Sequence, residues 1–158
     1  MVKNILIPID FSTQSLNTLK IALREHKGQN LNVWLIYAHN LSTSITELLF
    51  YSPKKILQSL INSEFEDALQ ILKNSHESNL KSIHIELFHG SNTQAFANFA
   101  HSKNIDVVYI PKTYRLKSGK HGFDPIKIIT NSKISYKEVS WTSDQNDSNS
   151  NTINHLFI

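Results

Sequence analysis

The sequence predicts a doubly wound α/β domain, with a five-stranded parallel sheet and helices on both faces. Five short apolar runs alternate with segments of helical periodicity, as expected where strands and helices follow one another along the chain. Several of these runs are apolar almost throughout, which is typical of parallel strands buried on both sides. A chain of 158 residues without cysteine is long enough to form one such domain around a hydrophobic core.

The first half of the chain contains two predicted strands and two predicted helices. Residues Asn4 to Ile9 form an Ile-rich strand, followed by an amphipathic helix from Gln14 to His26. Residues Asn32 to Ala38 form the second strand. A helix then opens at Ser52 and Pro53 and is expected to continue to about His76. The stretch from Asn40 to Tyr51 is expected to be irregular or partly helical, and could act as a flap.

The second half contains three further strands and two helices. Alternating apolar and polar residues from Ser82 to Phe88 predict a strand near a sheet edge, and the helix from Asn92 to Lys103 follows. The fourth strand spans Ile105 to Ile110. A short helix then starts at Asp124-Pro125 and ends near Lys133. The last predicted strand, Tyr136 to Trp141, would lie at an edge.

Composition narrows the classes of protein to consider. The net charge is +3, which is too small for a nucleic-acid-binding arm, and the cations form no stripe with aromatic residues. No apolar run approaches the roughly 20 residues that span a bilayer, and the N-terminus lacks a signal-peptide pattern. We therefore expect a cytoplasmic protein without membrane or nucleic-acid partners.

In folds of this class, ligands bind at the carboxyl ends of the strands, where the strand order reverses. The loops after the first and fourth strands, Asp10 to Ser15 and Pro111 to Asp124, are therefore the candidate binding segments. Asp10 either contacts a ligand or places a carboxylate at a helix N-terminus. Ser12 and Ser15 are expected to act mainly as helix caps or turn formers.

Three segments carry a resemblance to a known family: KNILIPIDFSTQS, LIYAHN and HGSNTQAFANFAHSKNIDVVYI. In this order they resemble the universal stress protein family, a branch of the adenine-nucleotide-binding, Rossmann-like α/β folds. The resemblance covers about residues 2 to 141. We therefore expect a domain over residues 1–141. The residues that follow are polar and then apolar, which indicates a polar linker and a short apolar tail over residues 142–158.

The resemblance also implies where a ligand would lie. Asp10 would face an adenine or ribose, and the backbone around Tyr37 and Ala38 would flank the base. Candidate cofactors are ATP and AMP. The candidate ligand-binding residues are Pro8, Asp10, Ser12, Tyr37, Ala38, Ile110, Lys112, Arg115 and Lys120.

The phosphate-binding signature of the family's ATP-binding members is incomplete in this chain. Those members use Gly-x2-Gly-x9-Gly-Ser/Thr after the fourth strand, because glycines let backbone N–H groups approach phosphate oxygens. One placement puts Pro111 and Tyr114 at the first two glycine positions, and Asp124 and Pro125 at the last pair. A second placement begins at Gly119-x-x-Gly122 but ends inside the last predicted helix, at residues 132–133.

The resemblance and the incomplete signature together suggest two alternative functions. The first is a stress-response binding or regulatory module with lost or weakened ATP binding. The second is an adenine-nucleotide binder in which Lys112, Arg115 and Lys120 replace the glycines at the phosphates. The same loop could also be simply solvated. Slow phosphotransfer would need metal ligands and a positioned water, and the sequence designates neither.

We expect no enzymatic activity. The eight histidines form no recognisable metal motif, and no nucleophile has an assigned base. We expect a homodimer that pairs the edge strand Tyr136–Trp141 with its symmetry mate, as family members often do. The apolar residues at the end of the tail could dock on this domain, on a dimer mate or on another protein.

Overall fold

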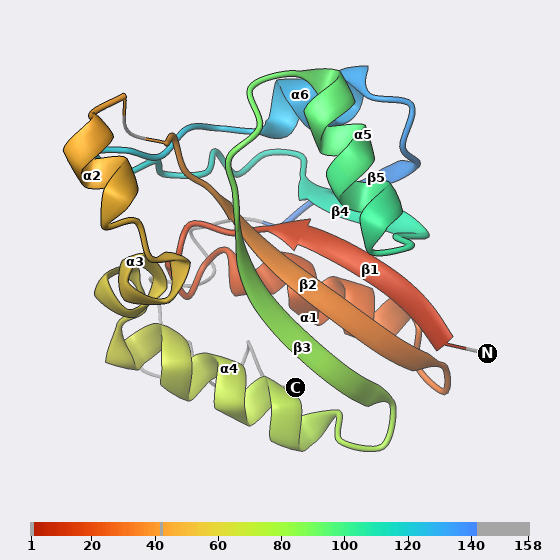
Figure 1. Ribbon diagram of the computed structural model, residues 1–158. Coiled ribbons are helices and arrows are strands. Elements are labelled where there is room, and N and C mark those ends of the chain that lie inside the picture. The colour runs from red at the N-terminus through yellow and green to blue at the C-terminus, as the bar shows by residue number, and fades with distance from the viewer. Residues whose placement is uncertain (1, 42, 142–158) are drawn as a thin grey trace.

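The computed structural model describes residues 2–41 and 43–141, which form a single parallel sheet with helices on both faces (Figure 1). The strand order is β3-β2-β1-β4-β5, and every neighbouring pair is parallel. The predicted fold class is therefore confirmed. The strands are β1 (Val2–Pro8), β2 (Asn30–Ala38), β3 (Leu80–Phe88), β4 (Val107–Pro111) and β5 (Tyr136–Val139).

The sheet separates two apolar layers, because successive side chains of a strand point to opposite faces. Ile5 and Ile7 of β1 pack with the helices on one face, whereas Leu6 packs with those on the other. The first layer includes α1 (Leu16–Glu25), α3 (Pro53–Leu60) and α4 (Ser63–Ser75), and the second includes α5 (Thr93–Ser102) and α6 (Ile126–Asn131).

The order of strands brings the two predicted binding loops together. β1 lies between β2 and β4. After β1 the chain forms β2 and β3 on one flank of β1, and it then crosses over to form β4 and β5 on the other flank. The carboxyl ends of β1 and β4 therefore meet at one edge, as the sequence predicted. Both predicted edge strands, β3 and β5, lie at the edges of the sheet.

The long helix predicted from Ser52 to about His76 is wrong in one respect, because it is two helices. Ile61 is extended, with ψ of 124°, and Asn62 starts the second helix. The Asn62 side chain accepts a hydrogen bond from the Phe65 N–H at 2.9 Å and donates one to the Phe11 carbonyl at 3.0 Å. One side chain thus caps α4 and ties it to the turn after β1.

The stretch from Asn40 to Tyr51 contains one short helix, α2 (Ile45–Leu49), which projects from the body of the domain (Figure 1). Its apolar side chains are largely exposed, up to 80% for the neighbouring Phe50. The predicted linker and apolar tail, residues 142–158, lie outside the described residues. Within the described part of the chain, no helix combines the length and apolar character needed to cross a membrane.

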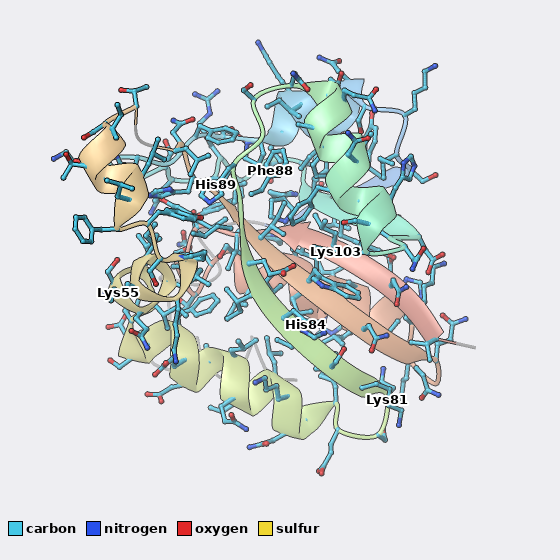
Figure 2. The ribbon with its side chains drawn as sticks, in the orientation of Figure 1. Lys55, Lys81, His84, Phe88, His89 and Lys103 are labelled. Atoms are coloured by element: carbon cyan, nitrogen blue, oxygen red, sulfur yellow. The ribbon has the colours of Figure 1, made fainter. Side chains whose placement is uncertain are left out.

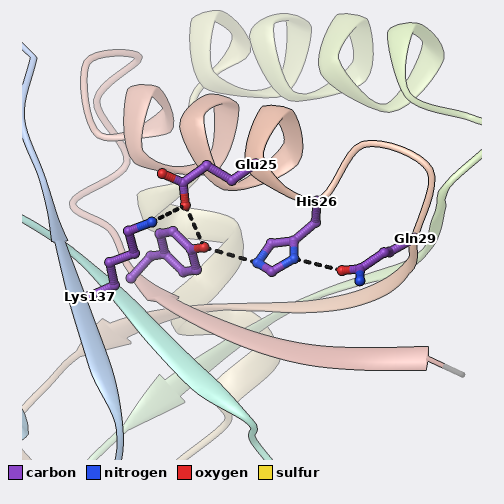
Figure 3. A network of polar contacts seen from close by, with 5 residues as sticks. Glu25, His26, Gln29 and Lys137 are labelled. Atoms are coloured by element: carbon purple, nitrogen blue, oxygen red, sulfur yellow. Dashed lines mark hydrogen bonds and ion pairs between the residues drawn. The ribbon is translucent and has the colours of Figure 1, made fainter.

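A polar network fixes the edge strand β5 to the end of α1 (Figure 3). Glu25 accepts hydrogen bonds from the Tyr109 hydroxyl at 2.7 Å and from the Lys137 ammonium at 2.8 Å. The same tyrosine oxygen lies 2.9 Å from Nε2 of His26, whose Nδ1 lies 2.8 Å from Gln29. The hydrogen bond and charge of Lys137 hold the pKa of Glu25 below its usual value, against a smaller opposing effect of burial.

Candidate functional site

The turn after β1 presents the carboxylate of Asp10 at the edge where β1 and β4 end. Phe11 follows with φ of 62°, an unusual conformation for a residue other than glycine. Its ring is buried between Tyr37 and Phe65, with ring centroids 5.1 and 5.2 Å away. The buried Phe11 ring thus holds the turn that carries Asp10.

The two serines of this turn form hydrogen bonds within it, and Ser12 Oγ also accepts the Ser15 N–H at 3.2 Å. Ser12 donates its hydroxyl to Oδ1 of Asp10 at 2.5 Å, and its N–H donates to the same oxygen at 3.0 Å. Ser15 donates its hydroxyl to the Ser12 carbonyl at 2.8 Å. Both serine side chains are therefore used within the turn. Ser15 occupies the N-cap position of α1, but its side chain makes no capping hydrogen bond.

The second oxygen of Asp10 is bonded by the segment that follows β4, residues 112–125, which we call the 112–125 loop. The Tyr114 hydroxyl donates to Oδ2 at 2.5 Å, and the Lys117 N–H donates to the same atom at 2.9 Å. The Tyr114 ring lies against Trp141, with centroids 4.7 Å apart. The carboxylate of Asp10 is therefore satisfied from within the chain.

These contacts set the protonation of the pair. Burial acts to raise the pKa of Asp10, but the hydrogen bonds from the Lys117 N–H, Ser12 and Tyr114 outweigh it and hold this pKa below the usual value. Burial and the bond to Asp10 raise the pKa of Tyr114 well above that of a free tyrosine. At neutral pH the pair is therefore a carboxylate that accepts a hydrogen bond from a neutral phenol.

The glycines of the 112–125 loop lie against the Tyr37 side chain. The Gly119 N–H donates to the Tyr37 hydroxyl at 3.1 Å. A Cβ at Gly122 would lie 2.5 Å from that hydroxyl, which leaves no room for a larger residue. Gly119-x-x-Gly122, the start of the second signature placement, thus serves a close approach to a buried tyrosine of the chain itself.

The backbone at the end of β2 is also bonded to this loop. The Phe123 N–H donates to the Ala38 carbonyl at 3.1 Å, and the Asn40 N–H donates to the His121 carbonyl at 2.7 Å. His39 and Gly122 form an isolated antiparallel bridge. The backbone expected to flank a base is therefore partly used by the 112–125 loop.

The other predicted site residues divide into buried and exposed groups. Pro8 and Ile110 are buried at the ends of β1 and β4, so they shape the site from within. Lys112, Arg115 and Lys120 are exposed on the 112–125 loop. The structure brings Asp10, Ser12, Tyr37 and Ala38 together under this loop, and leaves the three cations at its surface.

A cavity of about 490 Å³ lies beside this position, between the end of β2, α2 and α3. The end of β2, the segment from α2 to α3 and the 112–125 loop contribute aromatic and histidine side chains to its lining. The charged residues of the lining are Lys55, Lys120 and Glu47. Figure 2 labels Lys55 on α3 and His89 at the end of β3, on the side of the molecule where α2 lies. The lining residues are Tyr37, His39, Asn40, Leu41, Glu47, Phe50, Tyr51, Ser52, Lys55, Ile56, Ser59, Leu60, Lys120 and His121.

Three histidines gather beside this cavity, a grouping that the sequence prediction missed. The His39 ring lies 5.7 Å from that of His89 and 5.8 Å from that of His121, centroid to centroid. His89 Nδ1 lies 2.6 Å from the His39 carbonyl, and its Nε2 pairs with the Tyr51 hydroxyl. Nδ1–H therefore donates to the carbonyl, and Nε2 accepts from the phenol.

The histidines are 50 and 32 residues apart along the chain, so no local spacing could have indicated the cluster. Burial, together with the neighbouring His89 and His121, lowers the pKa of His39. Among the described residues, no group of three or more histidine, aspartate or glutamate side chains has a geometry that could hold a metal ion.

Comparison with known proteins agrees with this architecture. The model of the universal stress protein family matches residues 1–118. The universal stress protein UspA from Lactobacillus plantarum superposes with a TM-score of 0.56 at 15% identity, over 87% of this chain and 97% of that one. A member of the family from Burkholderia pseudomallei gives a TM-score of 0.52 at 10% identity, over 87% of this chain and 95% of that one.

A universal stress protein family protein from Arabidopsis thaliana, whose structure contains bound AMP, gives a TM-score of 0.48 at 9% identity. That comparison covers 93% of this chain and 97% of the plant protein. A comparison with curated proteins finds no match. The structural likenesses concern the fold alone, whereas the family model covers most of the sequence. This chain therefore belongs to the universal stress protein family.

Proposed function

We propose that this protein is a non-catalytic, cytoplasmic binding and regulatory module of the stress response, in which its own loop closes the position expected for a nucleotide. One observation carries the proposal. The carboxylate of Asp10, the hydroxyl of Tyr37 and the carbonyl of Ala38 all accept hydrogen bonds from the 112–125 loop. The family resemblance assigned Asp10 to the adenine or ribose and the backbone around Tyr37 and Ala38 to the base, so two of these three groups are expected ligand contacts and the Tyr37 hydroxyl lies beside them.

A nucleotide at this position would have to displace those internal hydrogen bonds. Each contributes about 1 kcal/mol net, and leaving a buried donor or acceptor without a partner costs more. In return, the segment after β4 offers the phosphates few backbone N–H groups. Pro111 has no N–H, and in one placement of the signature the Tyr114 side chain occupies a glycine position. The balance favours the closed loop over ATP.

Isothermal titration calorimetry with ATP, ADP and AMP, with and without magnesium, tests this proposal. The sample is first checked for nucleotide that co-purifies with it. We expect no binding at millimolar nucleotide, and micromolar binding would contradict the closed position. The Asp10→Asn variant then serves as a control for location, because any nucleotide bound at this position should respond to it.

The second candidate is an adenine-nucleotide binder that uses the exposed cations of the loop. The observation in its favour is that Lys112, Arg115 and Lys120 all lie at the surface of the 112–125 loop and are accessible to a phosphate. In this case Arg115→Glu and Lys120→Glu should each weaken ATP binding by about tenfold, the effect of one lost charge-assisted hydrogen bond. Unchanged affinity in both variants removes this candidate.

We further propose that the protein is a homodimer that pairs the β5 edges of two copies. β5 ends the sheet, and Tyr136 is 42% exposed on it. A two-fold pairing would satisfy the free edge. Light scattering after size exclusion should give twice the chain mass, and Glu138→Pro, at an exposed residue of β5, should reduce it to the monomer. A monomeric wild-type protein would contradict this assembly.

A further inference from the structure

We propose that the 490 Å³ cavity between β2, α2 and α3 is a binding site for a small aromatic anion, such as an aryl carboxylate or aryl sulfonate. Its lining contains neither Asp10 nor Tyr114 but includes Tyr37 and Lys120, so the cavity adjoins the position closed by the 112–125 loop and opens towards α2 and α3. The inference goes beyond the proposed function and does not depend on whether the protein binds ATP.

The size and composition of the cavity fit a small molecule. Small-molecule sites typically enclose about 300–1,000 Å³ and combine an apolar, aromatic wall with a few polar groups. Here the rings of Tyr37, Phe50 and Tyr51 line the cavity together with Ile56 and Leu60. Aromatic side chains bind another ring through offset or edge-to-face contacts, which a purely aliphatic wall cannot provide.

The charge of the lining selects an anion. Lys55 from α3 and Lys120 from the 112–125 loop line the same cavity, and Glu47 is the only acid among its lining residues. With neutral histidines the lining therefore carries a net charge of +1, from two lysines and one glutamate. Two cations from separate segments can engage a carboxylate or sulfonate from two directions.

The wall on the β2 side is held in place before any ligand arrives. The Tyr51 hydroxyl pairs with His89, and His89 in turn donates to the His39 carbonyl at 2.6 Å. The hydrogen bond from the Asn40 N–H to the His121 carbonyl fixes the part of the lining that the 112–125 loop contributes. A preformed wall reduces the entropy that binding must otherwise overcome.

Fluorescence titration with anilinonaphthalene sulfonate, an aromatic sulfonate, tests this site in the chain of 158 residues. We expect saturable binding that Lys55→Gln and Lys120→Gln each weaken by about three- to tenfold, since each removes one charge-assisted contact. Glu47→Gln removes the single negative charge and should strengthen binding. Lys54→Gln is the matched control, because Lys54 lies on the same helix but lines a different hollow.

Competition identifies the ligand class. Benzoate should displace the probe more effectively than benzamide, which has the same ring and no charge. Circular dichroism confirms that each variant is folded. The proposal is overturned by non-saturable binding, by equal affinities in Lys55→Gln, Lys120→Gln and Lys54→Gln, or by equal displacement by benzoate and benzamide. These outcomes leave the calorimetric test of nucleotide binding unaffected, so the two proposals fail separately.

Discussion

The Tyr114 hydroxyl donates a 2.5 Å hydrogen bond to the carboxylate of Asp10, from 104 residues further along the chain. This contact joins the loop after β4 to the turn after β1, across the point where the strand order reverses. It places a side chain of the protein in the region where the family resemblance expects a ligand. The account of function given above depends mainly on this pair.

Replacing Tyr114 with phenylalanine should destabilise the fold by about 1–2 kcal/mol, because Asp10 loses one donor while the ring can still pack on Trp141. The same change should raise the pKa of Asp10, since a hydrogen bond that favours its charged form is gone. Urea unfolding and NMR titration of the carboxyl carbon measure the two effects. Tyr136→Phe, at an exposed tyrosine on β5, is the control for the pKa measurement and should leave the pKa of Asp10 unchanged. An unaltered Asp10 pKa in Tyr114→Phe would mean that the bond does not persist in solution.

Replacing Gly122 with alanine should destabilise the protein by about 1–3 kcal/mol, the usual cost of forcing extra volume into a packed region. The new Cβ would lie 2.5 Å from the Tyr37 hydroxyl oxygen. Gly119→Ala, whose Cβ would lie 3.2 Å from the same oxygen, should cost less. Thermal unfolding compares the two variants. Combining Gly122→Ala with Tyr37→Phe should recover part of the loss, and no recovery would show that the hydroxyl is not the obstacle.

Asn62 is expected to contribute twice, as the cap of α4 and as a donor to the turn after β1. Asn62→Ala should cost about 1–2 kcal/mol through loss of the cap, with a further contribution from the unpaired Phe11 carbonyl. Asn62→Asp keeps a capping oxygen and loses only the donor, so it should be less destabilising. Urea unfolding of both variants separates the two roles. Equal losses would mean that the cap itself contributes nothing.

The histidine cluster should make stability depend on pH. Burial and the neighbouring histidines lower the pKa of His39 from its ordinary value of 6.5, and burial and Arg24 lower that of His76 in the same direction. The unfolded chain therefore binds protons that the folded protein does not, once the pH falls below about 6.5. The stabilising contribution is complete above that pH and is lost as the pH falls towards the folded-state values.

Urea unfolding at a series of pH values from neutral to mildly acidic measures this loss. His39→Gln should make the profile shallower without flattening it, because His76 still contributes. A profile identical to that of the wild type would exclude His39 as a source of the acid sensitivity.

Much of the architecture was predictable because it depends on local patterns. The short, Ile-rich apolar run Asn4–Ile9 favours a buried strand, and the resemblance supported the doubly wound arrangement. The break at Asn62 was also readable in principle, since an Asn followed by acidic residues is typical of a helix start. The apolar residues on both sides of Asn62 keep a helical periodicity, so the pattern predicted one continuous helix.

The closure of the site was harder to predict, because it depends on contacts between distant segments. One placement of the signature put Tyr114 at a glycine position, but the sequence did not indicate that its hydroxyl would bond to Asp10. The cluster of His39, His89 and His121 draws on the ends of β2 and β3 and on the 112–125 loop. The spacing of these three histidines along the chain does not indicate that their side chains lie together.

Amide hydrogen exchange at Lys117, Gly119 and Phe123 tests the central claim most directly. Their N–H groups bond to Asp10, Tyr37 and Ala38. The account predicts slow exchange at all three in the protein without ligand, and no change when millimolar ATP and magnesium are added. Exchange as fast as in an unfolded peptide, or protection that appears only with ATP, would contradict a position closed by the chain itself.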